Sequence, residues 1–169
     1  MRIALDTNIL AYAEGIGDGA RQQASLDLIR KITPPRVVIP AQCLGELFRV
    51  LTGKARRDAA SAQEAVLGWT DAYETADSTW TAFQSAMDVA ANHNLQIWDA
   101  LILAVAAEQR CRLLLSEDMQ PEFTWRGVTV VNPYQEPKHH LLQTMLADEG
   151  RPPHTSPRRS PGSIGEKAG

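Results

Sequence analysis

The chain has 169 residues, of which 44% are hydrophobic and 22% are charged, and its formal net charge is −3 at pH 7. This length fits one domain with a substantial core and leaves little room for a second. The weak negative charge excludes the strongly basic field of many nucleic-acid-binding proteins, so any nucleic acid must be held locally.

The sequence has the features of a soluble, cytoplasmic protein. Asp6 interrupts the first apolar run, so no signal peptide is predicted. No later run reaches the length of a membrane span, so no association with a membrane is predicted. Cys43 and Cys111 lie in apolar segments and lack metal-ligand spacing. We therefore expect both thiols to be reduced and buried in the core.

Strand and helix patterns alternate along the chain. Strands are predicted over residues 2–5, 37–39, 112–115 and 127–131, with a weak edge strand over 74–78. Helices are predicted over residues 7–13, 20–32, 42–51, 57–73, 79–92 and 97–109. This alternation predicts an α/β fold, a single domain whose central sheet is mainly parallel and carries helices on both faces.

Apolar stripes predict which faces of two helices are buried. In the helix over 42–51 the stripe leaves Glu46 to one side and consists of Leu44, Leu47, Phe48 and Leu51. In the helix over 79–92 the side chains expected to face the core are Phe83, Ala86, Met87 and Ala90.

The composition changes after Pro137. Residues 138–149 are predicted to form a short amphipathic helix, within an extension over 134–149 that follows a domain over 1–133. Residues 150–169 contain four of the ten prolines of the chain, and this composition predicts a disordered tail.

Residues 97–107 form the most apolar segment of the chain, and Asp99 is its one charged residue. A helix that is apolar nearly all round is expected to be buried, and a buried carboxylate is unfavourable unless it is neutralised or meets a cation. Asp99 has two explanations at this stage. It either caps or charges the helix N-terminus, where the helix dipole favours an anion, or belongs to a site.

Four acidic residues occupy positions that a parallel sheet would bring together. Asp6 and Asp118 directly follow predicted strands, whereas Glu46 and Asp99 lie on helices of the same sheet. Ligands of such sheets bind outside the carboxyl ends of the strands. Four carboxylates there would repel one another strongly unless a cation intervened, and an all-oxygen set suits Mg²⁺ or Mn²⁺ better than zinc. Taken alone, Glu46 is more typical of a solvated glutamate.

Four segments, in order, resemble the motifs of PIN-domain proteins, and within that superfamily the VapC-type toxins of prokaryotic toxin-antitoxin systems. The segments are ALDTNIL at 4–10, Glu46 with Leu47, WDALI at 98–102 and LLSED at 114–118. The resemblance extends over about residues 1–133. It implies a PIN-like fold and a metal-dependent endoribonuclease with an RNA substrate, a cognate antitoxin protein and a possible homodimer.

The resemblance also implies roles for single residues. The acidic centre, which would bind Mg²⁺ or Mn²⁺, would consist of Asp6, Glu46, Asp99 and Asp118. Thr7 and Ser116 would offer hydroxyls to metal-bound water, and Asn8 would brace the turn. Glu117 stands beside Asp118 and could replace it as the fourth acid, but Ser116-x-Asp118 is the form that resembles the family, so Asp118 is preferred.

Two other functions fit parts of the sequence. A non-catalytic PIN-like module would bind RNA or protein without cleaving it, and the intact set of four acids favours the enzyme. A haloacid-dehalogenase-like phosphatase also uses an aspartate after the first strand together with Mg²⁺. That family requires a second aspartate two residues later, where this chain has Asn8.

The densest basic cluster consists of Arg49, Lys54, Arg56 and Arg57. It could contact phosphates or an acidic partner, or it could be a solvated helix end.

Overall fold

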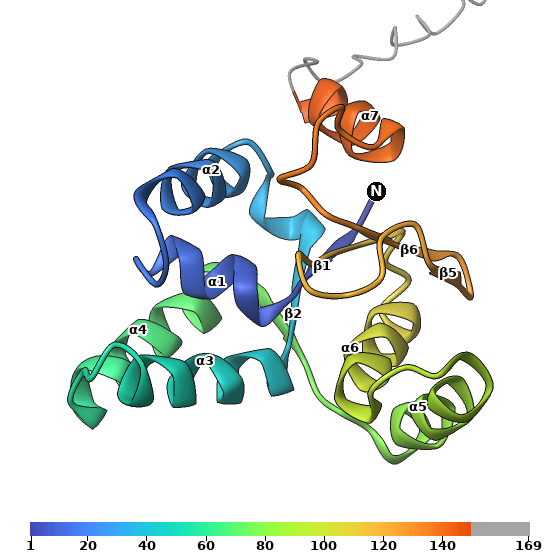
Figure 1. The fold of residues 1–169 in the computed structure, drawn as a ribbon, viewed down its shortest axis with the longest axis horizontal. Coiled ribbons are helices and arrows are strands. Elements are labelled where there is room, and N and C mark those ends of the chain that lie inside the picture. The colour runs from blue at the N-terminus through green and yellow to red at the C-terminus, as the bar shows by residue number, and fades with distance from the viewer. Residues whose placement is uncertain (150–169) are drawn as a thin grey trace, which may run out of the picture.

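A mainly parallel sheet forms the centre of the protein (Figure 1). The computed structural model describes residues 1–149, so the disorder predicted over 150–169 lies outside the described residues. The strand order is β3-β2-β1-β4-β6-β5, and neighbouring strands pair in parallel except β5 with β6. The strands are β1 (Ile3–Leu5), β2 (Val37–Pro40), β3 (Glu74–Ala76), β4 (Leu113–Leu115), β5 (Thr124–Trp125) and β6 (Val128–Val131).

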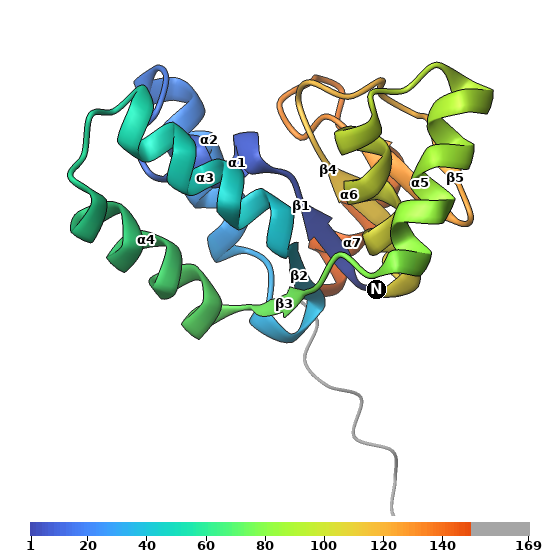
Figure 2. The same cartoon turned by 90° about the horizontal axis from the view of Figure 1, so that it is seen from below.

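Helices cover both faces of the sheet, as the alternation of elements predicted. Figure 2 shows α1, α2, α3 and α4 grouped on one side of β1, and α5 and α6 on the other. The helices are α1 (Thr7–Ala13), α2 (Gly19–Arg30), α3 (Ala41–Gly53), α4 (Ala59–Ala72), α5 (Trp80–His93), α6 (Ile97–Glu108) and α7 (His140–Glu149), and one 3₁₀ turn spans Pro34–Arg36. The α/β fold class is confirmed.

Short polar side chains set the starts of four helices. Asp6, Asp18, Asp58 and Thr79 each accept a hydrogen bond from a backbone N–H in the first turn that follows. Such caps satisfy donors that have no partner within the helix and stabilise it by about 1 kcal/mol each. At Asp6 the cap has a second consequence, because it fixes a carboxylate at the end of β1.

Helix α6 lies at the centre of the core. Its residues Ala100–Ala106 are all buried, because the helix packs between α5 and the strands β2, β4 and β6. An all-round apolar sequence predicts this surrounded position. The burial of α6 gives Asp99, in its first turn, a fixed place relative to the sheet.

Two predicted core positions are wrong. Phe48 is 37% exposed and Met87 is 47% exposed. In α3 the buried face is rotated toward Cys43, because this helix packs against both α1 and α4. In α5 the buried residues are the small Ala82 and Ala86 with Val89, since small side chains permit close packing against α6.

The sequence patterns also missed β5. Two residues are too few for a strand pattern, and the strand forms because Arg126 and Gly127, both with positive φ, make the short turn into β6.

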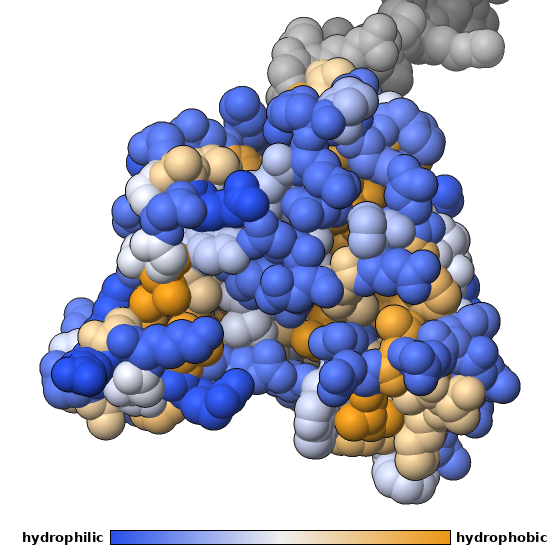
Figure 3. Space-filling view, in the orientation of Figure 1, coloured by the Kyte–Doolittle hydropathy of each residue, from blue (hydrophilic) through white to orange (hydrophobic). Residues whose placement is uncertain are grey.

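Cys43 and Cys111 are buried and free, as expected. Hydrophobic residues appear in Figure 3 as separate patches among hydrophilic ones. Within residues 1–149, no helix has the combination of length and apolar character needed to cross a membrane.

Glu14 links the end of α1 to α4 and to the segment before it. Its carboxylate accepts hydrogen bonds from Arg57 Nη1 at 2.8 Å and from Trp69 Nε1 at 3.0 Å, and its backbone carbonyl accepts one from Arg57 Nη2 at 2.6 Å. Arg57, one member of the basic cluster, is therefore paired within the fold.

Replacing Glu14 should destabilise the protein. Glu14→Ala leaves the partly buried Arg57 and Trp69 donors without their acceptor, so we expect the free energy of unfolding in urea to fall by about 1–3 kcal/mol. The control is Arg30→Ala, which removes an exposed pair with Asp27 at 3.6 Å and should change stability by less than about 0.5 kcal/mol. Equal losses for the two variants would contradict the structural role of Glu14.

Candidate active site

The candidate site lies at the carboxyl ends of β1 and β4. These strands are neighbours whose last residues, Leu5 and Leu115, are paired in register. The N–H of Asp6 donates to the Leu115 carbonyl at 3.0 Å, so Asp6 and Ser116 leave the sheet side by side. This edge is where ligands bind in parallel α/β sheets.

One cavity of about 240 Å³ contains all four acids singled out from the sequence. They reach it from four places: the cap of α1, helix α3, the first turn of α6 and the loop after β4. The cavity is lined by Asp6, Thr7, Asn8, Ala11, Tyr12, Ile16, Glu46, Val50, Lys54, Asp99 and Asp118. Segments more than a hundred residues apart in the sequence thus contribute to one acidic cavity, which Lys54 also lines.

Asp6 is the most deeply buried of the four acids, with 7% of its surface exposed. Its Oδ1 accepts from the Thr7 N–H at 2.6 Å, and its Oδ2 accepts from Ser116 Oγ at 2.6 Å and from Asn8 Nδ2 at 3.0 Å. Burial raises the pKa of Asp6 to about 6, with Asp99 and Glu46 adding to the rise, although the bonds from Ser116 and Thr7 oppose it. The hydrogen bonds that the protein donates to Asp6 therefore do not fully offset the cost of ionising this buried carboxyl group.

Glu46 is held by two neighbours. Its Oε2 accepts from the Thr7 hydroxyl at 2.8 Å, and its Oε1 accepts from Gln42 Nε2 at 2.9 Å. Gln42 also donates to the Trp98 carbonyl at 3.4 Å, so it connects α3 with the first turn of α6. Glu46 is half-buried and oriented, which differs from a freely solvated glutamate.

Asp99 lies half-buried in the first turn of α6. The N-cap residue of that helix is Gln96, so the interpretation of Asp99 as a cap is wrong. Its pKa is raised by burial first and then by the charges of Glu46 and Asp118. The local charges that shift Asp99 are thus the other acids of the cavity.

Asn8 connects the two ends of the site. Its Nδ2 donates to Asp6 Oδ2 at 3.0 Å and to Asp118 Oδ2 at 3.3 Å, and its Oδ1 accepts from the Glu117 N–H at 3.3 Å. Asn8 therefore braces the loop after β4 against the start of α1. The Ser116 hydroxyl is fully buried and donates to Asp6, so it orients that carboxylate instead of reaching water in the cavity.

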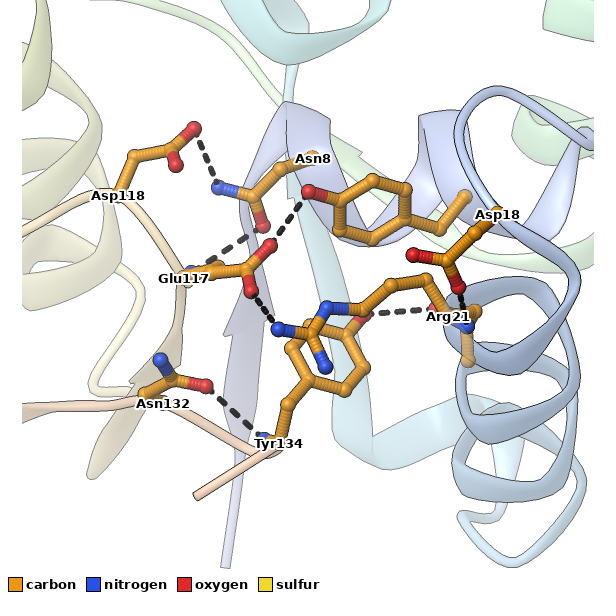
Figure 4. A network of polar contacts seen from close by, with 9 residues as sticks. Asn8, Asp18, Arg21, Glu117, Asp118, Asn132 and Tyr134 are labelled. Atoms are coloured by element: carbon orange, nitrogen blue, oxygen red, sulfur yellow. Dashed lines mark hydrogen bonds and ion pairs between the residues drawn. The ribbon is translucent and has the colours of Figure 1, made fainter.

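Glu117 and Asp118 point in different directions. Figure 4 shows the Glu117 carboxylate directed at Arg21 and away from Asp118. Glu117 also accepts a hydrogen bond from the Tyr12 hydroxyl, whereas Asp118 lines the acidic cavity. Sequence reasoning missed Gln42 and Tyr12, whereas Lys54 belongs to the basic cluster that it named as a possible phosphate contact. The spacing of Gln42 four residues before Glu46 on one helix was the one available signal for the two missed residues.

The donors of the cavity fit a hard divalent cation. Among residues 1–149, no three His, Cys, Asp or Glu side chains are already arranged to hold a metal ion. Mg²⁺ usually binds to one or two carboxylates and keeps several water ligands, so an open cavity with oxygen donors is suitable. Burial, and after it the charges of neighbouring acids, raises the pKa values of Asp6 and Asp99, and a bound cation would favour the ionised carboxylates.

Comparisons with known proteins agree with this fold. VapC20 of Mycobacterium tuberculosis, described as a sarcin-ricin loop cleaving toxin, is 21% identical over 69% of this chain and 89% of that chain, with a TM-score of 0.60. A toxin-antitoxin complex from Klebsiella pneumoniae is 20% identical over 79% of this chain and 98% of that chain, also with a TM-score of 0.60.

DNA-bound VapBC from Salmonella typhimurium is 16% identical over 77% of this chain and 96% of that chain, with a TM-score of 0.54. At such identities the likeness concerns the fold alone. No curated protein sequence matches the chain. The model of the PIN domain family matches residues 3–122, which is more than half of the chain, and the protein therefore belongs to the PIN domain family.

Proposed function

We propose that the protein is a metal-dependent endoribonuclease that cleaves RNA phosphodiester bonds. The observation that carries this proposal is the single cavity in which Asp6, Glu46, Asp99 and Asp118 meet. Lys54 lines the same cavity and offers a positive charge to a phosphate group. The site therefore combines ligands for a divalent cation with a contact for the substrate backbone.

The four acids would hold Mg²⁺ or Mn²⁺, which when bound lowers the pKa of a coordinated water and offsets charge on a phosphodiester. The remaining contacts set where those acids lie. Thr7 and Gln42 orient Glu46, whereas Ser116 and Asn8 orient Asp6.

A cysteine nucleophile is not supported. Cys43 is fully buried, and burial holds the pKa of its thiol well above the usual value, so it is not a reactive thiolate.

We also propose that the chain is the toxin of a toxin-antitoxin pair. The structures it resembles include a toxin that cleaves the sarcin-ricin loop and complexes of toxins with antitoxins. We expect a cognate antitoxin, encoded by a small adjacent reading frame, to bind the purified protein and to suppress RNA cleavage. A partner that binds without reducing cleavage would contradict this assignment.

Cleavage should depend on a divalent cation. Purified protein incubated with structured and unstructured RNA should cleave in Mg²⁺ or Mn²⁺ and should lose activity in excess EDTA, because the donors of the cavity are carboxylates. Restored cleavage after Mn²⁺ is added back provides the control for protein integrity. Full activity in EDTA would rule out the proposed metal centre.

Asp99→Asn should separate catalysis from stability. The change removes one of the four acids, so RNA cleavage should fall on the order of 100-fold or more. Without metal, the variant should unfold at an equal or higher temperature, because the pKa of Asp99 is raised by burial, Glu46 and Asp118. A raised pKa means that the folded state loses stability as pH rises, so the stability advantage of the variant should grow as the pH rises above about 4, the ordinary pKa of an aspartate.

The matched control is Asp88→Asn, since Asp88 is exposed on α5 and lies outside the cavity. We expect unchanged cleavage and unchanged melting for this variant, measured in EDTA for stability and in Mg²⁺ for activity. If Asp99 served only as a charge near the start of α6, its replacement would lower stability by roughly 0.3–1 kcal/mol and leave cleavage intact. Near-normal cleavage by Asp99→Asn would remove Asp99 from the active site.

A further inference from the structure

We propose that Glu117 is a positioning residue of the acidic site. Together with Arg21 and Tyr12 it anchors the loop after β4, and the anchored loop places Asp118 at the cavity. This inference rests on the proposed function of that cavity as a divalent-cation site. It assigns a role to an acidic residue that stands directly beside a candidate ligand without being one.

Both carboxylate oxygens of Glu117 are already engaged by the protein. Oε2 accepts a hydrogen bond from the Tyr12 hydroxyl, and Oε1 forms an ion pair with Arg21 Nη2 (Figure 4). The Glu117 side chain is 17% exposed and the Arg21 side chain is 39% exposed, so the ion pair is shielded from solvent mainly on the side of Glu117. Arg21 balances the charge of Glu117, which therefore adds little to the repulsion among the four acids of the cavity.

The two partners of Glu117 are themselves held in place. The Arg21 guanidinium lies over the ring of Tyr134, 4.7 Å from its centroid, and the ring of Tyr12 packs edge-on against the same tyrosine at 5.7 Å. The Tyr134 hydroxyl lies 2.6 Å from Oγ of the buried Ser25, which bonds to the Arg21 carbonyl at 2.9 Å. Glu117 is thus attached to a packed block formed by α1, α2 and the segment after β6.

Tyr12 suits the role of a permanent donor. The hydrogen bond to Glu117, and after it burial, raises the pKa of Tyr12 to about 12. Its hydroxyl consequently keeps its proton across the range in which RNA cleavage would be measured. The contact between Tyr12 and Glu117 persists at neutral pH.

Asp118 needs such support more than the other acids. It is exposed and lies on a loop, and its carboxylate accepts from Asn8 Nδ2 across 3.3 Å. The same Asn8 accepts from the Glu117 N–H, so the backbone between Glu117 and Asp118 is fixed at two points: by the Asn8 amide and by the Glu117 side chain. Loosening one of these points would let the Asp118 carboxylate drift from the cavity.

The experiment measures Mn²⁺ binding to the full chain by isothermal titration calorimetry, alongside kcat and KM for RNA cleavage. Mutation of a residue that orients a metal ligand typically lowers metal affinity or activity by 10- to 100-fold. We expect Glu117→Gln to weaken Mn²⁺ binding by about 10-fold and to lower kcat, with KM for RNA nearly unchanged. Tyr12→Phe, which removes only the hydroxyl, should also weaken Mn²⁺ binding and lower kcat, but by less than Glu117→Gln.

Two further variants test whether Arg21 and Glu117 act together. Arg21→Gln should weaken Mn²⁺ binding, and adding Glu117→Gln should weaken it little further, because each change breaks the same contact. Arg30→Gln is the matched control, since Arg30 lies on the same helix and pairs at the surface with Asp27. It should bind Mn²⁺ and cleave RNA like the wild type.

The wild type and Asp118→Asn separate failure of this inference from failure of the proposed function. If the wild type binds no Mn²⁺ and cleaves no RNA, both are overturned. If it binds Mn²⁺ and Asp118→Asn weakens that binding while Glu117→Gln binds normally, the proposed function stands and the positioning role is overturned. A lower melting temperature of Glu117→Gln in EDTA with normal Mn²⁺ affinity would also overturn it, because such a variant has lost only structural support.

Discussion

Repulsion among four carboxylates is the constraint around which the site is arranged. Asp6 lies at the edge of an apolar core, where burial and the charges of Asp99 and Glu46 favour its protonated form. Water cannot screen these charges fully at a buried position. The protein keeps the acids together because the same contacts that build the fold, the cap of α1 and the pairing of β1 with β4, also fix the carboxylates. The fold and the electrostatic strain of the site therefore arise from the same residues.

The groups that orient the acids come from the sequence immediately around them. Thr7 and Asn8 follow Asp6, Gln42 precedes Glu46 by one helical turn, and Ser116 directly follows β4, two residues before the fourth acid. The segments around Asp6, Glu46 and Asp118 therefore each supply an acid together with a donor for an acid of the same or another segment. The Thr7 hydroxyl, for example, reaches Glu46 on α3. Such crossed contacts stabilise the site as a unit, because displacing one element leaves the acid of another without its donor.

Local patterns in the sequence predicted the helices and strands more accurately than they predicted the contacts between these elements. Periodicity was sufficient for the strands that pair in parallel and for the buried helix α6, and strand ends placed Asp6 and Asp118 at one edge of the sheet. Periodicity failed for Phe48 and Met87, because neighbouring helices decide which apolar side of α3 and α5 is covered. It also could not pair Glu117 with Arg21, since these residues lie 96 positions apart and meet only through the packing of α2 on α1.

The four acids differ in how rigidly the fold holds them, and this difference explains the extra contacts around the fourth. Asp6 is bound to the end of a central strand, and Asp99 lies in the first turn of a helix whose following residues, Ala100–Ala106, are buried. Ligands on such elements hold their geometry more closely than ligands on loops. Asp118 follows β4 on a loop, so its position relies on side-chain contacts. A neighbouring acid paired with an arginine from α2 supplies that attachment without adding an uncompensated charge to a cavity that already contains four.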